Sequence, residues 1–144
     1  MSCNQCQESI RGTGCTARGV CGKDEMTAQL QDVLVYATEG LALSAEKQQG
    51  SVSRKVGQLI SHSLFVTVTN TNFDEDAIVL QIRKTLAMRD ELNETLSHLP
   101  HHDAANWTGS SKEDFLQNII IRQIQSASYS VSMYSNSHLV TNNP

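Results

Sequence analysis

Apolar residues recur at three- and four-residue steps along three stretches of the chain, a spacing typical of amphipathic helices. The first stretch, 24–47, opens with Asp24, a suitable N-cap, and is followed by Gly50, a plausible stop. Its apolar stripe consists of Met26, Leu30, Val33, Leu34, Ala37 and Leu41. We therefore predict a helix over 24–47 whose stripe faces the core.

The second and third stretches predict two further helices. Residues 54–70 combine helical spacing with strand-like alternation over 65–69, and we favour a helix because no partner strand is evident. Residues 74–99 follow Asn72, which with Glu75 resembles a capping box, and Pro100 would end that helix. Its stripe consists of Ile78, Ile82, Leu86, Arg89, Leu92, Leu96 and Leu99.

This pattern predicts an all-α fold, with an N-terminal Cys-rich loop followed by an antiparallel three-helix bundle. The loop covers 1–23, the bundle with a polar connection covers 24–116, and a divergent serine-rich tail covers 117–144. Six of the twelve residues from 126 to 137 are serine, and we interpret the tail as poorly ordered or a short edge segment.

Composition narrows the range of partners. The chain has 144 residues and a net charge of −4, which gives no reason to expect nucleic acid or an anionic membrane. No apolar run is long enough to span a membrane, and the N-terminus has no signal-peptide pattern. We therefore expect a cytoplasmic protein whose thiols stay reduced.

The four cysteines carry the candidate chemistry. Cys3, Cys6, Cys15 and Cys21 all lie in the first 21 residues, with the spacing C-x2-C-x8-C-x5-C. In a reducing compartment such clustering favours metal binding over a two-disulfide clip. Four glycines among them allow the backbone to approach a ligand closely.

The neighbouring residues favour an iron–sulfur cluster over zinc. Arg11, Arg18 and Lys23 can offset the negative charge of four thiolates and tune a reduction potential. Structural zinc sites more often use two short Cys pairs, and here there is one. Zinc and a two-iron cluster remain alternatives at this point.

Several motifs resemble the N-terminus of the hybrid-cluster proteins, or hydroxylamine reductases. They are CNQCQE at 3–8, TGCT at 13–16, GVCGK at 19–23, TAQLQD at 27–32, TVTNTNFD at 67–74 and WTG at 107–109. They cover roughly the first 110 residues. The resemblance implies a helical N-terminal domain whose Cys3, Cys6, Cys15 and Cys21 ligate a [4Fe-4S] cluster for electron transfer from a redox carrier.

The chain also departs from this family. Family members are several hundred residues long, and cysteines, glutamates and a histidine of later domains hold their catalytic hybrid cluster. No cysteine follows Cys21 here, so we expect neither the hybrid cluster nor hydroxylamine reduction from this chain alone. We expect a truncated or interrupted product, or a split iron–sulfur subunit that acts with a separate catalytic chain. A structural zinc-binding helical domain is the other alternative.

The remaining candidates have simpler interpretations. The histidines, His62, His98, His101, His102 and His138, are more typical of surface positions than of ligands. Trp107 suits a packing anchor, and the acidic residues 74–76 suit a helix start. The sequence contains no phosphate-binding glycine loop and no Ser–His–Asp arrangement that we recognise.

Overall fold

The computed structural model describes residues 1, 3, 5–6, 13–48, 50–68 and 73–108. These residues form the helices α1 (Glu25–Lys47), α2 (Arg54–Val68), α3 (Glu75–Asn93) and the short α4 (Asp103–Asn106). No strand occurs in these ranges, only an isolated bridge between Cys3 and Cys15. The predicted helical class is therefore confirmed, and residues 54–68 are a helix rather than a strand.

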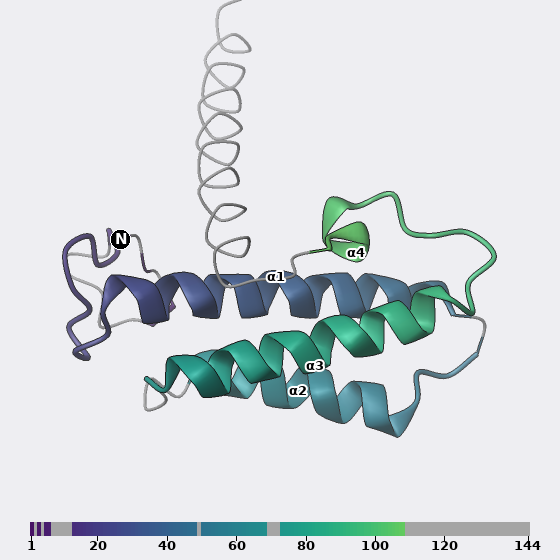
Figure 1. The fold of residues 1–144 in the computed structure, drawn as a ribbon, viewed down its shortest axis with the longest axis horizontal. Helices are drawn as coiled ribbons and strands as arrows, with labels where there is room; N and C mark the ends of the chain where they lie inside the picture. Colours follow the sequence, from purple (N-terminus) through teal and green to yellow (C-terminus); the bar gives the residue numbers. More distant parts are fainter. Residues whose placement is uncertain (2, 4, 7–12, 49, 69–72, 109–144) are drawn as a thin grey trace, which may run out of the picture. The chain divides into compact units, whose positions relative to one another are not determined.

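Helix α1 is the element on which the rest of the described chain packs. It contacts α2, α3 and α4, and α2 also contacts α3. Figure 1 shows that α2 runs back along α1 and that α3 then runs in the direction of α1. The cysteine segment lies at the N-terminal end of α1 (Figure 1).

The predicted stripes form most of the apolar core. Leu30, Leu34 and Leu41 of α1 and Ile78 and Ile82 of α3 are completely buried. Removing each such side chain from water stabilises the fold by about 1.5–3 kcal/mol. Because these residues were selected by helical spacing alone, the hydrophobic pattern accounts for the main α1–α3 packing.

Polar side chains are buried between α2 and α3 as well. The Gln81 Nε2 donates to Ser63 Oγ at 2.9 Å, and Ser63 Oγ and Thr85 Oγ1 lie 3.1 Å apart. All three residues are buried. Such a network is tolerated in a core because its polar groups are paired with one another.

Helix α4 docks on α1 at a glycine. A Cβ at Gly40 would lie 2.2 Å from the carbonyl oxygen of Ala104, so only glycine permits this approach. Arg89 of α3 donates to the same Ala104 oxygen at 2.9 Å, and Asn93 Nδ2 donates to Ala105 at 2.8 Å. α4 is thus held by α1 and α3 together.

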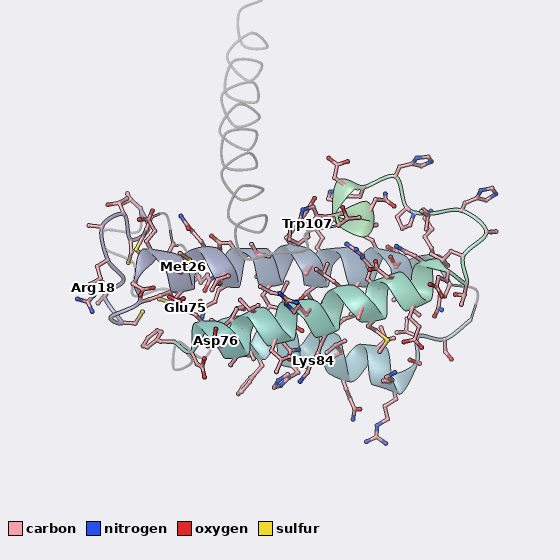
Figure 2. The ribbon with its side chains drawn as sticks, viewed as in Figure 1. Arg18, Met26, Glu75, Asp76, Lys84 and Trp107 are labelled. Carbon is pink, nitrogen blue, oxygen red and sulfur yellow. The ribbon has the colours of Figure 1, made fainter. Side chains whose placement is uncertain are left out.

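Trp107 follows α4 and anchors the connection, as its sequence context predicted. Its ring centroid lies 5.7 Å from that of Tyr36 of α1, in a tilted arrangement. Figure 2 shows Trp107 beside α4, away from the cysteine segment at the other end of α1. Aromatic pairs at this spacing add about 0.5–1.5 kcal/mol beyond their buried area.

Three sequence predictions need correction. The third helix ends at Asn93 rather than near Pro100. The backbone N–H and the hydroxyl of Thr95 both donate to the carbonyl oxygen of Leu92, and these bonds end the helix there. Consequently Leu99 lies outside the helix and is 47% exposed. The N-cap is Asp74, whose side chain accepts from Ala77 N, rather than Asn72.

The third correction concerns the polar connection, which contains α4. The predicted serine-rich tail at 117–144 lies outside the described residues, as does Asn72. None of the helices described here is both long enough and apolar enough to cross a membrane.

Candidate metal centre

The four candidate cysteines occupy one segment before α1. All four thiols are free of disulfides. Cys3 and Cys15 are buried, Cys6 is half-buried and Cys21 is exposed. The four cysteines lie in the part of the chain that precedes α1.

Cys3 and Cys15 are brought together by their backbones. Cys3 N donates to Cys15 O at 3.1 Å, and Cys15 N donates to Cys3 O at 2.8 Å. Directly opposed residues of an antiparallel pair project their side chains to the same face. Both cysteines pack with Ala28 of α1, so this pair is fixed to the helix.

A tight turn presents Cys21. Gly19 N donates to Lys23 O, and Gly22 N donates to Gly19 O, both at 2.9 Å. Gly22 has a φ of +92°, which side chains rarely adopt. A Cβ at Gly19 would lie 3.1 Å from Cys21 Sγ, so the glycine leaves space beside that sulfur.

The cations predicted to offset thiolate charge occupy different environments. Lys23 is buried, and its Nζ lies 4.0 Å from Cys3 Sγ. Arg18 is exposed; its Nε donates to Gly22 O at 3.3 Å, and Figure 2 shows its side chain extending from the outside of the segment. Arg11 lies outside the described residues.

Two glutamines and a carboxylate surround Lys23, and helical periodicity did not single them out. Lys23 Nζ donates to Gln31 Oε1 of α1 and to Gln5 Oε1, the latter at 2.9 Å. Gln5 Nε2 in turn donates to Asp32 Oδ1 at 3.2 Å. Gln31 and Asp32 lie in the TAQLQD motif, which is the one sequence signal that includes them.

Burial raises the pKa of Asp32 to about 6 from its ordinary value of 3.8. The hydrogen bond from Gln5 and the positive charge of Lys23 act in the opposite direction and reduce that rise. At the start of α1, by contrast, the backbone N–H of Thr27 lowers the pKa of Asp24. The cysteine end of α1 therefore holds two carboxylates whose pKa values shift in opposite directions, and Asp32 is the one on which the charge of Lys23 acts.

The donor chemistry of this segment fits an iron–sulfur cluster, since it offers four free thiols and glycines that make room for a bulky group. The described conformation nevertheless brings only Cys3 and Cys15 into backbone pairing. Within the described ranges, no three His, Cys, Asp or Glu side chains lie together as a metal-binding group. The assignment of four ligands stays a prediction.

The histidines of the described ranges do not supply a better donor set. His62, His98 and His101 are exposed. His102 is the N-cap of α4: its Nδ1 accepts from Ala104 N, and its Nε2 lies 3.5 Å from Glu39. These contacts explain His102 as a structural residue.

Comparison with known proteins decides the family. The sequence model of the Prismane/CO dehydrogenase family matches residues 1–138. The chain belongs to the Prismane/CO dehydrogenase family. This match extends beyond the 110 residues over which the sequence motifs carried the resemblance.

Curated relatives of this Prismane-family chain are hydroxylamine reductases. The hydroxylamine reductase of Chlorobaculum tepidum is 62% identical over 128 residues, which cover 89% of this chain and 24% of that protein. Those of Acetivibrio thermocellus and Desulfitobacterium hafniense are 45% and 42% identical over 81% of this chain. The chain spans about a quarter of the length of these relatives.

Proposed function

We propose that this chain is the iron–sulfur-binding N-terminal part of a hydroxylamine-reductase-like oxidoreductase and that it serves electron transfer. The observation that carries the proposal is the confinement of four free cysteines to one segment at the start of α1. Membership of the Prismane/CO dehydrogenase family and the relatives named hydroxylamine reductase support it.

Each residue has a defined role in this proposal. Cys3, Cys6, Cys15 and Cys21 provide four thiolates to a [4Fe-4S] cluster, which when bound supplies a one-electron redox couple. The Cys3–Cys15 pair fixes two ligands to α1, and Gly19 and Gly22 shape the turn that carries Cys21. Cys6 and Cys21 must move toward that pair to complete the ligand set.

The proposal assigns the reduction of hydroxylamine to the longer protein rather than to this chain. The later cysteines that the family resemblance assigns to a hybrid cluster have no counterpart after Cys21. A reduced carrier protein would donate the electron, and a catalytic region or separate chain would receive it. The part played by these 144 residues is to bind and position the cluster.

The test is the iron, sulfide and zinc content of the anaerobically purified chain, together with its visible spectrum. About four irons and four sulfides per chain would support the proposal. We expect Cys→Ser at each of the four positions to lower the iron content sharply. Val20→Ser is the matched control, because Val20 is an exposed neighbour of Cys21 and carries no ligand atom.

Two outcomes would contradict the proposal. About one zinc per chain without sulfide would indicate a structural zinc domain. Full iron in every Cys→Ser variant would remove these cysteines from the ligand list. A larger protein that copurifies with the iron-loaded chain would instead identify a split subunit.

A further inference from the structure

Lys23 is the most deeply buried cation among the described residues of the cysteine segment. Only 1% of its surface is exposed, although it lies in the segment before α1. An ammonium group has three N–H donors, and each of them has an acceptor here. The acceptors are Gln31 Oε1, Gln5 Oε1 at 2.9 Å and Cys3 Sγ at 4.0 Å.

The surroundings of Lys23 lack a direct counter-charge from the described residues. Two of its acceptors are neutral amides, and Asp32 acts on it only through space. A buried cation is strongly disfavoured unless negative charge lies near it. The remaining acceptor, Cys3 Sγ, lies 4.0 Å away and would supply that charge as a thiolate ligand of the proposed cluster.

We propose that Lys23 is a positioning residue of the cluster site: its buried ammonium provides the local counter-charge for the Cys3 ligand and raises the reduction potential of the group bound there. This inference rests on the proposed function. Among the cations of the segment, Lys23 is thus the one whose removal should change the reduction potential measurably.

The direction of the effect follows from Coulomb's law. Reduction adds one electron, so the bound group becomes one unit more negative, while the Lys23 ammonium at Cys3 keeps its place. A fixed positive charge in a water-poor site stabilises the reduced form more than the oxidised form. Removing that charge therefore lowers the potential. The exposed guanidinium of Arg18 is screened by water and salt, so its removal has a much smaller effect.

Lys23 also connects the two parts of the chain that form the site. Gln5 belongs to the N-terminal segment and Gln31 to α1, and the same ammonium binds both. The charge is therefore held at a fixed place relative to the Cys3–Cys15 pair. Lys23→Arg would keep the positive charge and some of the hydrogen bonds, whereas Lys23→Met would keep only a side chain of similar length.

The experiment is a redox titration of the anaerobically reconstituted full chain with dithionite, followed by visible absorption. The variants are Lys23→Met, Lys23→Arg and, as the matched loss of an exposed cation, Arg18→Met. At the wild-type midpoint potential, we expect the ratio of reduced to oxidised cluster in Lys23→Met to fall by about tenfold. We expect Arg18→Met to change it by less than about twofold, and Lys23→Arg to restore most of the wild-type ratio.

The outcomes separate this inference from the proposed function. If wild type binds no iron and sulfide, the proposed function fails. If wild type and Lys23→Met both hold the cluster with the same potential, the role of Lys23 is overturned and the proposed function stands. If Lys23→Met does not hold the cluster, Lys23→Gln, which is neutral but polar, is titrated in its place. An unchanged potential in Lys23→Gln would equally overturn the role of Lys23.

Discussion

Two long cations are buried in the described part of the chain, and they are held in different ways. Arg89 and Lys23 are each only 1% exposed. Arg89 binds the carboxylate of Asp90 through Nε at 2.9 Å and through a terminal nitrogen at 2.6 Å, and it also donates to Ala104 O. Lys23 is bound by two amide oxygens and the Cys3 sulfur.

Arg89 therefore acts as a structural cation of the fold, whereas Lys23 is placed as a cation of the candidate binding site. Arg89 brings its own counter-ion and joins α3 to α4, so its charge is compensated whatever else the chain binds. The compensation of Lys23 within the described chain is incomplete, and its sulfur partner is a candidate cluster ligand. The first arrangement serves stability, and the second is suited to a bound group with negative charge.

The largest expected effect on the free energy of unfolding comes from removing the side-chain bonds of Arg89. We expect Arg89→Met to lower the free energy of unfolding by about 3 kcal/mol, because Ala104 O loses its charged donor in a buried place. Lys23→Met in the metal-free chain should change it by less than about 1 kcal/mol, since removal of a poorly compensated buried charge offsets the lost hydrogen bonds. Urea unfolding measures both, and equal losses would contradict the comparison.

The next prediction concerns the charges around Lys23 and tests the raised pKa of Asp32. The pKa of Asp32 is raised from 3.8 to about 6, so the folded chain holds this proton more tightly than the unfolded chain does. The free energy of unfolding should therefore fall as the pH rises from about 4 to about 6 and stay level above that window. Asp32→Asn should remove the fall and make the chain about 2 kcal/mol more stable at pH 7.5, with no gain at or below pH 4.

Asp24 provides a control of opposite sign for this measurement. Its pKa is lowered by the hydrogen bond from Thr27, so its contribution is present above its ordinary pKa and is lost as the pH falls. Asp24→Asn should therefore reduce the loss of folding stability at acidic pH. It should leave unchanged the loss of stability that Asp32 causes as the pH rises. A pH profile of Asp32→Asn that parallels wild type would show that Asp32 is not the responsible carboxylate.

The smallest effect tests how Arg89 reaches α4. Gly40→Ala should lower the free energy of unfolding by about 1 kcal/mol, because the new Cβ would collide with Ala104 O and displace the carbonyl from Arg89. Gly57→Ala in α2 is the matched control, since a Cβ there meets nothing within 4 Å. It should stabilise the helix by up to about 1 kcal/mol. The same sign for both substitutions would contradict the close approach at Gly40.

The sequence was sufficient to predict the three long helices and most of their apolar faces. Periodicity selected Leu30, Leu34, Ile78 and Ile82, which are buried, because helical spacing and burial are directly linked. It also included Arg89 in the third stripe, where the structure places a buried cation. The end of that helix was missed because Thr95, a local hydrogen-bonding residue, stops it well before Pro100 does.

The details of the site depend on contacts that a linear pattern does not contain. The cysteines were visible as a cluster in the sequence, but nothing in their spacing distinguishes the buried pair from the exposed Cys21. Lys23 and Arg18 also looked equivalent, and their difference arises only when Gln31 on α1 meets the N-terminal segment. In the same way, the requirement for glycine at position 40 becomes visible only once α4 packs against α1.

The backbone pairing of Cys3 with Cys15 has a consequence for assembly. If the proposed cluster binds here, two of its ligands already lie on the same face of one backbone bridge, so little chain entropy would be lost in bringing these two together. Cys6 is half-buried and Cys21 is exposed, and both would have to approach that pair to complete the proposed ligand set. Loading of the proposed cluster would then begin at the two cysteines that these backbone hydrogen bonds already hold together.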